Sequence, residues 1–205
     1  MDSISRAKLL KAREFLSGPG VAVGVGEGDA LGAKLIERAG FDFVWSSSLC
    51  VSASFAVPDA NPISMSQYCD AARSMNEVIS IPVIAGCDTG YGNANNLICA
   101  VKKFEEAGVV GISIEDKKFP KDNSLLEGGR QELAPVEEFA GKIKLFISAN
   151  QPLRTSVKAQ EAVLTEMKKA GGIHTIDDLM VSVSRVFDLQ GVPAMKDAEK
   201  MYLVS

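Results

Sequence analysis

Three carboxylates that follow predicted strands or loops are the residues of this sequence best suited to chemistry. Asp59 follows Pro58 in a loop, Asp88 opens the segment D-T-G-Y-G-N, and Glu115 ends the apolar run 109–114. Carboxylates that meet at one place repel each other unless a cation lies between them. Oxygen ligands with added water suit Mg²⁺, with Mn²⁺ as the alternative. If the fold brings Asp59, Asp88 and Glu115 together, they predict a divalent metal site.

Each of these acids also has a simpler interpretation. Asp88 and Asp59 are residue types favoured in turns and loops, whatever the function. The charged run 115–118 (E-D-K-K) is also typical of a solvated surface. The one histidine, His174, lies beside a helix start and is expected to be structural. Cys87 has no histidine near it in sequence, which disfavours a nucleophilic role.

Predicted strands alternate with predicted helices through the first two thirds of the chain. The strands are Val21–Val25, Phe41–Trp45, Ile81–Gly86, Val109–Ile114 and Lys142–Ala149. The helices between them are residues 30–39, capped by Asp29 and ended by Gly40, then Met65–Val78 and Asn95–Ala107. This alternation predicts βαβ units and a parallel sheet. The candidate acids then lie beyond the carboxyl ends of strands, which is the active face of a parallel barrel.

The last third is predicted to be helical. Pro152–Ala170, a helix capped by Thr175, and Ala194–Tyr202 follow one another without a strand, which favours a helical subdomain or a subunit contact. We expect residues 1–205 to form a single partial barrel domain, with a βα portion at 1–149 and a helical segment at 150–205. A closed barrel needs eight strands, so five would leave edges for a partner or the terminal helices to cover.

The composition is that of an ordinary globular protein. Of 205 residues, 46% are hydrophobic and 23% charged, and the net charge of −4 gives no basic footprint for nucleic acid or an anionic membrane. No apolar run approaches the roughly 20 residues of a membrane span. The amphipathic N-terminus predicts a first helix rather than a transit peptide, because it contains Asp2 and Glu14. Four widely spaced cysteines suit a reducing compartment, and we expect a cytoplasmic location.

Four segments, in order, resemble the phosphoenolpyruvate mutase branch of the isocitrate lyase superfamily. They are A-G-F-D-F-V-W-S-S-S-L (39–49), V-P-D-A-N (57–61), D-T-G-Y-G-N (88–93) and E-D-K-K-F-P-K-D-N-S-L (115–125), and the tail A-N-Q-P-L-R-T-S-V (149–157) is similar to the last strand and helix of that family. The resemblance implies a (β/α)8 barrel of the helix-swapped type, truncated here to about five parallel strands plus C-terminal helices. It also implies a homodimer or homotetramer that assembles through those helices.

The resemblance assigns roles to particular positions. It implies that Asp59, Asp88 and Glu115 surround Mg²⁺, mostly through waters. It places Lys121, Asn123 and Ser124 on a gating loop, with Asn123 touching the transferring phosphoryl group. The implied catalytic residues are Asp59, Lys121 and Asn123, and the implied substrate-binding residues are Trp45, Ser47, Ser48, Leu49, Asn123 and Ser124.

The implied reaction is the Mg-assisted interconversion of phosphoenolpyruvate and phosphonopyruvate through a pyruvate enolate. Asn123 favours such a mutase, a phosphonate-metabolising isomerase, over a phosphonopyruvate hydrolase. A C–C lyase acting on a 2-oxo or 2-hydroxy acid is the other alternative, although the absence of a K-K-C-G-H motif argues against isocitrate and methylisocitrate lyases. A hypothesis of another class is a catalytically inactive, truncated homologue that acts as an assembly module.

Two departures from the family pattern affect this interpretation. The family has a metal-binding Asp where this chain has Gly86, so Mg²⁺ should bind more weakly or through an extra water. Three central βα units, about 90 residues at roughly 30 per βαβ step, are missing between Lys144 and Ile147. That block supplies the phosphoryl-binding arginine, and Arg130 and Arg154 are substitutes only by charge. A shortened gene model of a complete barrel would explain the gap.

Overall fold

The computed structural model describes residues 3–92, 94–115, 145–148, 151–173 and 175–202. It divides into two compact units, Met1–Leu153 and Arg154–Ser205, which are described separately. The first unit contains the sheet and the candidate acids. The grouping of 1–149 and 150–205 into one domain stays a prediction.

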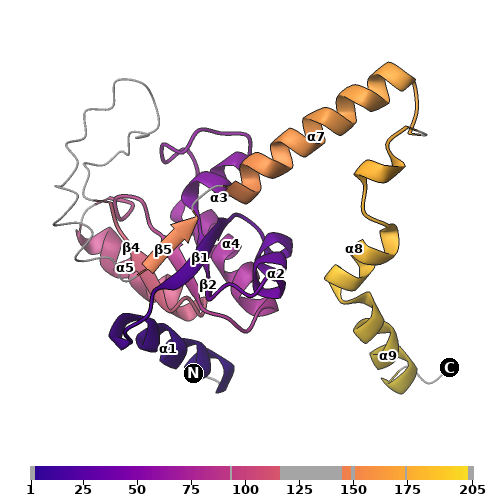
Figure 1. The fold of residues 1–205 in the computed structure, drawn as a ribbon. Helices are drawn as coiled ribbons and strands as arrows, with labels where there is room; N and C mark the ends of the chain where they lie inside the picture. Colours follow the sequence, from indigo (N-terminus) through magenta and orange to yellow (C-terminus); the bar gives the residue numbers. More distant parts are fainter. Residues whose placement is uncertain (1–2, 93, 116–144, 149–150, 174, 203–205) are drawn as a thin grey trace. The chain divides into compact units, whose positions relative to one another are not determined.

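A five-stranded parallel sheet forms the centre of the first unit (Figure 1). Its strands are β1 (Ala22–Glu27), β2 (Phe43–Ser46), β3 (Val83–Gly86), β4 (Gly111–Ser113) and β5 (Leu145–Ser148). They lie in the order β4-β3-β2-β1-β5, and every neighbouring pair is parallel. The predicted fold class, a truncated parallel α/β sheet, is therefore confirmed. The last strand pairs with the first, as it does where a parallel barrel closes.

Helix α1 precedes the first strand and four further helices connect the described strands, and α2, α3 and α4 begin at polar N-caps. They are α1 (Ser3–Ser17), α2 (Ala30–Arg38), α3 (Ser48–Ser54), α4 (Met65–Val78) and α5 (Ala94–Glu106). The predicted cap of α2 is confirmed, because Oδ1 of Asp29 accepts a hydrogen bond from the Gly32 amide at 2.8 Å. Helix α3 was not predicted. The Ser47 hydroxyl accepts from the Cys50 amide at 3.4 Å and so starts this helix as its N-cap, a role that serine favours.

The hydrophobic core lies between the sheet and helices α2, α4 and α5. Val83, Ala85 and Cys87 alternate along β3 and its end, and all three belong to the cluster packed against those helices. Because successive strand side chains point to opposite faces, Ile84 and Gly86 lie on the other face. Cys87 therefore lies on the helix side and Gly86 on the inner side, as expected from alternation.

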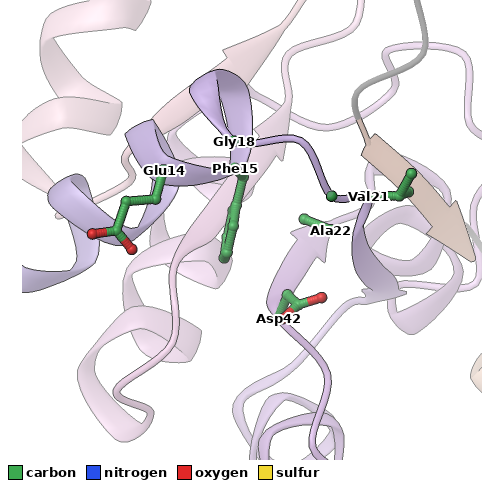
Figure 2. A pocket seen from close by; sticks show the side chains of 7 residues that line it. Glu14, Phe15, Gly18, Val21, Ala22 and Asp42 are labelled. Carbon is green, nitrogen blue, oxygen red and sulfur yellow. The ribbon is translucent and has the colours of Figure 1, made fainter.

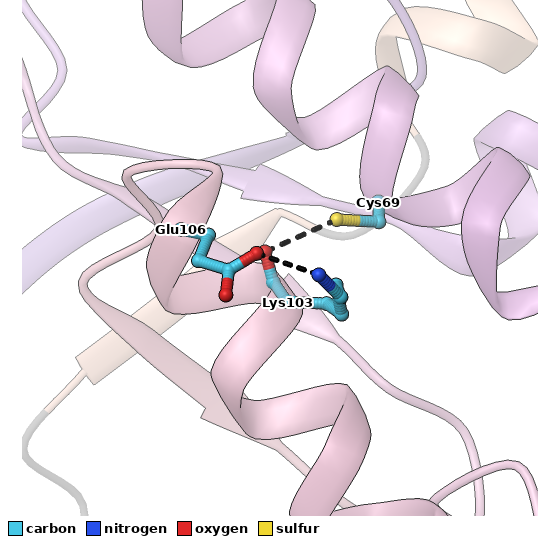
Figure 3. Close-up of polar contacts among 3 residues, drawn as sticks. All are labelled: Cys69, Lys103 and Glu106. Atoms are coloured by element: carbon cyan, nitrogen blue, oxygen red, sulfur yellow. Dashed lines mark hydrogen bonds and ion pairs between the residues drawn. The ribbon is translucent and has the colours of Figure 1, made fainter.

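Helices α4 and α5 are also joined by a polar contact (Figure 3). The Cys69 thiol of α4 donates to the carbonyl oxygen of Lys103 in α5 at 3.4 Å. The Lys103 ammonium also pairs with Glu106 at 2.8 Å, but both side chains are more than half exposed, so this ion pair adds little stability.

Polar and aromatic side chains of α1 contact the rest of the first unit. Lys8 is only 2% exposed and donates from Nζ to the Asn76 carbonyl oxygen at 2.6 Å and to Asn76 Oδ1 at 2.8 Å. The rings of Phe15 and Phe43 lie 6.2 Å apart between centroids. The predicted first helix is confirmed, and it contacts both α4 and the inner face of β2.

Gly24 in β1 leaves the space that the Phe43 ring occupies. A Cβ atom on Gly24 would overlap the Phe43 ring, so Gly24→Ala should lower the free energy of unfolding by about 1–3 kcal/mol. Urea unfolding measures this change. Gly20→Ala is the matched control, because a Cβ atom there meets nothing within 4 Å and should change stability by about 0.5 kcal/mol or less. Equal unfolding midpoints for the two variants would contradict the packing argument.

The C-terminal part of the chain is helical, with boundaries that differ from the predicted ones. It contains α7 (Gln151–Ala170), a 3-10 turn at Asp177–Leu179, α8 (Val183–Gln190) and α9 (Val192–Tyr202). The expected helix after Thr175 is wrong: the turn there has Ile176 at its N-cap position and no side-chain cap. The helix begins later because the Ser182 hydroxyl accepts from the Arg185 amide at 3.1 Å. No helix in the described ranges is long and apolar enough to cross a membrane.

Candidate functional site

The three predicted acids lie in segments that leave the carboxyl edge of the sheet. Asp59 lies between α3 and α4, Asp88 directly follows β3, and Glu115 follows β4. The Glu115 amide donates to the backbone carbonyl oxygen of Asp88 at 2.7 Å. Asn61, two residues after Asp59, donates from Nδ2 to Asp88 Oδ2 at 2.7 Å. Hydrogen bonds therefore link the segments that carry all three acids.

Two of these carboxylates are buried. Asp59 is 6% exposed and Asp88 is 1% exposed. Oδ2 of Asp59 accepts a long hydrogen bond from the Ser48 hydroxyl at 3.5 Å. Burying a carboxylate is costly unless hydrogen bonds or an opposite charge compensate it. Two buried carboxylates at one edge of a sheet are more typical of a functional site than of ordinary turn residues, which was the simpler interpretation of Asp59 and Asp88.

The backbone around these acids is held in unusual conformations. Four non-glycine residues of the described chain have positive φ: Ala56 (56°), Asn61 (59°), Asp88 (45°) and Tyr91 (61°). This left-handed region is sparsely populated by residues with a side chain, and such strain is concentrated at functional sites. All four lie in the loops before α4 and after β3, which are the loops that carry Asp59 and Asp88.

The residues predicted to bind substrate lie at the same edge. Trp45 is in β2, and an added Cβ on Gly86 of the neighbouring strand would meet its Cζ2 atom at 3.1 Å. The buried Ser47 donates from its amide to the Glu27 carbonyl oxygen at 3.0 Å. Ser48 and Leu49 form the first turn of α3.

Lys121, Asn123, Ser124 and Arg130 lie outside the described residues. Arg154 begins the second unit. The roles predicted for these residues stay predictions.

The side chains at the carboxyl edge offer oxygen donors, which magnesium requires. Within the described ranges, no group of three or more His, Cys, Asp or Glu side chains could by itself hold a metal ion. The donors at this edge are carboxylate, amide and hydroxyl oxygens, which match Mg²⁺, a cation that usually keeps several of its waters. Gly86 contributes no ligand atom from its side chain. The donor set therefore fits hydrated Mg²⁺.

Two polar residues at this edge were not identified from the sequence. Glu27 ends β1, and burial raises the pKa of its carboxyl above the ordinary value, while the Gly28 amide donates to its Oε1 at 2.7 Å. It was missed because the predicted strand ended at Val25. Asn61 was missed because its contact with Asp88 is tertiary, although it ends the quoted segment V-P-D-A-N.

The buried cysteines near the acids are poor nucleophiles. Burial raises the pKa of the Cys50 thiol to about 11 and that of the Cys87 thiol to about 12. Because the thiolate is the reactive form, both should be inert at neutral pH. This agrees with the sequence argument against Cys87 as a nucleophile.

A pocket lies at the other end of the strands and is not part of this site (Figure 2). It is lined by Glu14, Phe15, Gly18, Gly20, Val21, Ala22 and Asp42. Ala22 begins β1 and Asp42 precedes β2, which places the pocket at the amino end of the parallel strands. Asp42 has a structural contact there, because its Oδ2 accepts from the Val23 amide at 2.8 Å.

Comparison with known sequences identifies a family for most of the chain. Residues 27–168 match the sequence model of phosphoenolpyruvate phosphomutase. The chain is 53% identical over 117 residues to phosphonopyruvate hydrolase of Variovorax sp. (strain Pal2), covering 57% of this chain and 40% of the relative. It is 46% identical over 132 residues to phosphoenolpyruvate phosphomutase of Tetrahymena pyriformis, covering 64% of this chain and 44% of the relative. The chain thus spans less than half the length of these two curated relatives.

Solved structures of a phosphomutase and of a phosphonopyruvate hydrolase superpose on this chain. Phosphoenolpyruvate phosphomutase from Streptomyces platensis subsp. rosaceus superposes with a TM-score of 0.87 at 29% identity, covering 96% of this chain and 99% of that chain. A phosphonopyruvate hydrolase in complex with oxalate and Mg²⁺ superposes with a TM-score of 0.86 at 26% identity, covering 97% of this chain and 100% of that chain.

Proposed function

Because the chain belongs to the phosphoenolpyruvate phosphomutase family, we propose that it acts on phosphonopyruvate and interconverts it with phosphoenolpyruvate. The relatives named above are enzymes that act on these compounds. The five described strands form one parallel sheet, and its carboxyl edge is where the substrate would be held.

Hydrogen bonds join the loops that carry the three acids. Asp59, Asp88 and Glu115 come from three separate segments, and these segments are connected by the Asn61–Asp88 and Glu115–Asp88 hydrogen bonds at the carboxyl edge of one parallel sheet. In parallel α/β proteins this edge is where ligands bind. A set of oxygen donors at this edge is the expected arrangement for an enzyme that binds a hydrated divalent cation.

The proposed roles follow from chemistry and placement. Asp59, Asp88 and Glu115 would hold Mg²⁺ through its waters, and Mn²⁺ would be a substitute. The bound cation supplies positive charge that stabilises an enolate oxygen. Ser47, Ser48 and Leu49 would hold and orient the pyruvyl oxygens, since they lie together at the start of α3.

The remaining roles lie partly outside the described residues. Trp45, which lies beside Gly86, would border the bound pyruvyl group. Lys121, Asn123 and Ser124 would close over the substrate and exclude water, which would otherwise hydrolyse the phosphoryl group in transfer.

Phosphonopyruvate hydrolysis is the second candidate activity. It is favoured by the 53% identity to the Variovorax hydrolase, compared with 46% to the Tetrahymena mutase. The chain is also 40% identical over 138 residues to 2,3-dimethylmalate lyase of Eubacterium barkeri, which keeps C–C cleavage of a related acid as a further alternative.

Phosphorus NMR distinguishes these activities. The purified chain is incubated with phosphonopyruvate and MgCl₂, and a parallel sample contains EDTA. Growth of a phosphoenolpyruvate signal supports the mutase, whereas inorganic phosphate with equimolar pyruvate supports the hydrolase. Either activity should be lost with EDTA and restored by excess Mg²⁺ or Mn²⁺. No turnover above the buffer rate at high protein concentration would refute both.

A non-catalytic assembly module is the competing proposal of another class. It is favoured by the large exposed apolar side chains of the second unit, which include Leu164 (62% exposed), Val183 (66%) and Phe187 (48%). We expect such helices to pack against a second copy, giving a homodimer or homotetramer. Multi-angle light scattering tests this assembly, and a stable monomer at micromolar concentration would contradict it.

A further inference from the structure

Asn61 links the loop that carries the buried Asp59 to the buried Asp88 carboxylate. It follows Asp59 by two positions in the loop between α3 and α4, and its Nδ2 donates to Asp88 Oδ2 at 2.7 Å. Asp88 belongs to a different loop, which follows β3. One side chain thereby links the position of the Asp59 loop to the orientation of the Asp88 carboxylate.

The conformation of Asn61 restricts which residue can occupy this position. Its φ is 59°, in the left-handed region that asparagine, aspartate and glycine tolerate best. Glycine would adopt this φ but has no side-chain donor. Aspartate would place a second carboxylate against Asp88, where like charges repel. Among these three residues, only asparagine combines the required backbone with a donor.

The charge state of the donor also matters. A lysine or arginine at this position would neutralise Asp88, whereas the Asn61 amide carries no charge. The amide fixes one carboxylate oxygen and leaves the negative charge of Asp88 to attract a hydrated cation. Groups that orient ligands in this way contribute to metal affinity although they do not touch the metal.

We propose that Asn61 is a positioning residue that orients Asp88 for divalent cation binding. This inference rests on the metal site of the proposed function. It assigns to Asn61 no contact with substrate or with the reacting atoms. Its effect is exerted through the Asp88 carboxylate.

Isothermal titration of the full chain with MgCl₂ tests the proposal. Asn61→Gly keeps the left-handed backbone accessible and removes only the donor, so Mg²⁺ affinity should fall about 10- to 100-fold. The matched control is Ala56→Gly, which relaxes another left-handed residue of the same loop, with φ 56°, and should leave the affinity unchanged. If phosphonopyruvate turnover is present, saturating Mg²⁺ should restore most of kcat in Asn61→Gly while the Mg²⁺ concentration for half-maximal rate stays raised.

Hydrogen–deuterium exchange of the metal-free protein gives a second readout. The Glu115 amide donates to the Asp88 carbonyl oxygen, so its exchange should accelerate in Asn61→Gly and not in Ala56→Gly. Faster exchange confined to residues 55–64 would show that Asn61 orders only its own loop and would overturn the proposal.

The metal titration separates this inference from the proposed function. An unchanged Mg²⁺ affinity in Asn61→Gly would overturn the positioning role alone, and a wild-type chain that binds no Mg²⁺ would also overturn it. A wild type that binds Mg²⁺ and turns over no phosphonopyruvate would refute the proposed activity. The positioning role would then still stand if Asn61→Gly weakens binding.

Discussion

The Asp88→Asn variant should lose roughly 10³-fold in kcat/KM for phosphonopyruvate, or about 4 kcal/mol of transition-state stabilisation. The substitution removes one negative charge at a position that is 1% exposed, and nearly preserves the shape of the side chain. The new amide oxygen can still accept the hydrogen bond from Asn61 that Oδ2 accepts in the wild type. The loss should therefore come from weakened cation binding and not from a disturbed fold.

The Asp88→Asn substitution should not lower the stability of the fold. Removing a buried charge relieves its desolvation cost, so the metal-free Asp88→Asn protein should unfold at the same or higher urea concentration than wild type. A large loss of activity without a loss of stability is the signature of a functional acid. Phosphorus NMR rates and urea unfolding of the same preparation measure the two quantities.

Asp29→Asn is the matched control for this substitution. Asp29 is an exposed N-cap of α2, and asparagine caps a helix about as well as aspartate. Its activity and stability should both stay near wild type. An Asp88→Asn variant that keeps wild-type turnover would exclude Asp88 from the site and would remove the main support for the proposed metal.

The Gly86→Asp variant should bind Mg²⁺ roughly tenfold more tightly than wild type, or by about 1.4 kcal/mol. Alternation along β3 places residue 86 on the inner face of the sheet, two positions before Asp88. A further carboxylate raises the negative charge of the site, and the number of charged ligands sets the affinity of oxygen sites for divalent cations. The gain should appear in a titration with MgCl₂.

Space at this position is tight but sufficient. A Cβ atom on Gly86 would lie 3.1 Å from Cζ2 of Trp45 and 3.6 Å from the Ser46 carbonyl oxygen. A shift of the indole ring by a few tenths of an ångström would relieve the first contact. Trp45 is the single tryptophan of the chain, so its fluorescence reports this shift directly.

Gly86→Ala separates the steric effect from the charge effect. It introduces the same Cβ atom without a carboxylate, and should show the fluorescence change without the gain in affinity. If Gly86→Asp folds and binds Mg²⁺ no better than Gly86→Ala, residue 86 does not lie beside a cation site.

Much of the fold could be predicted from sequence patterns. The alternation of short apolar runs with amphipathic helices identified the five strands of the described residues, because each run is bounded by glycine, proline or a polar residue. Helix α3 was missed because seven residues are too few for a helical period to stand out, and the run of three serines resembles a loop. A helix was predicted after Thr175, where the structure has only the 3-10 turn Asp177–Leu179. The prediction was wrong because acidic residues after Thr175 also suit the start of a helix.

The candidate site was only partly predictable. Asp59, Asp88 and Glu115 could be selected because each carboxylate lies beyond an apolar segment or in a quoted motif. The bridge from Asn61 to Asp88 could not, because it joins residues from separate loops. The positive φ of Asp88 could not be predicted from the sequence either, since aspartate is common both in strained and in relaxed turns.

The strand order has a consequence for how the first unit folds. β1 to β4 each pair with a strand close in sequence, whereas β5 pairs with β1, so that Val23 lies opposite Phe146. Pairing β5 with β1 closes the long stretch of chain between Val23 and Phe146, which costs conformational entropy before the strand contacts compensate it. Strand pairs that are distant in sequence therefore form late in folding. The four consecutive strands should therefore assemble first, and β5 should dock onto β1 in the slowest step of refolding.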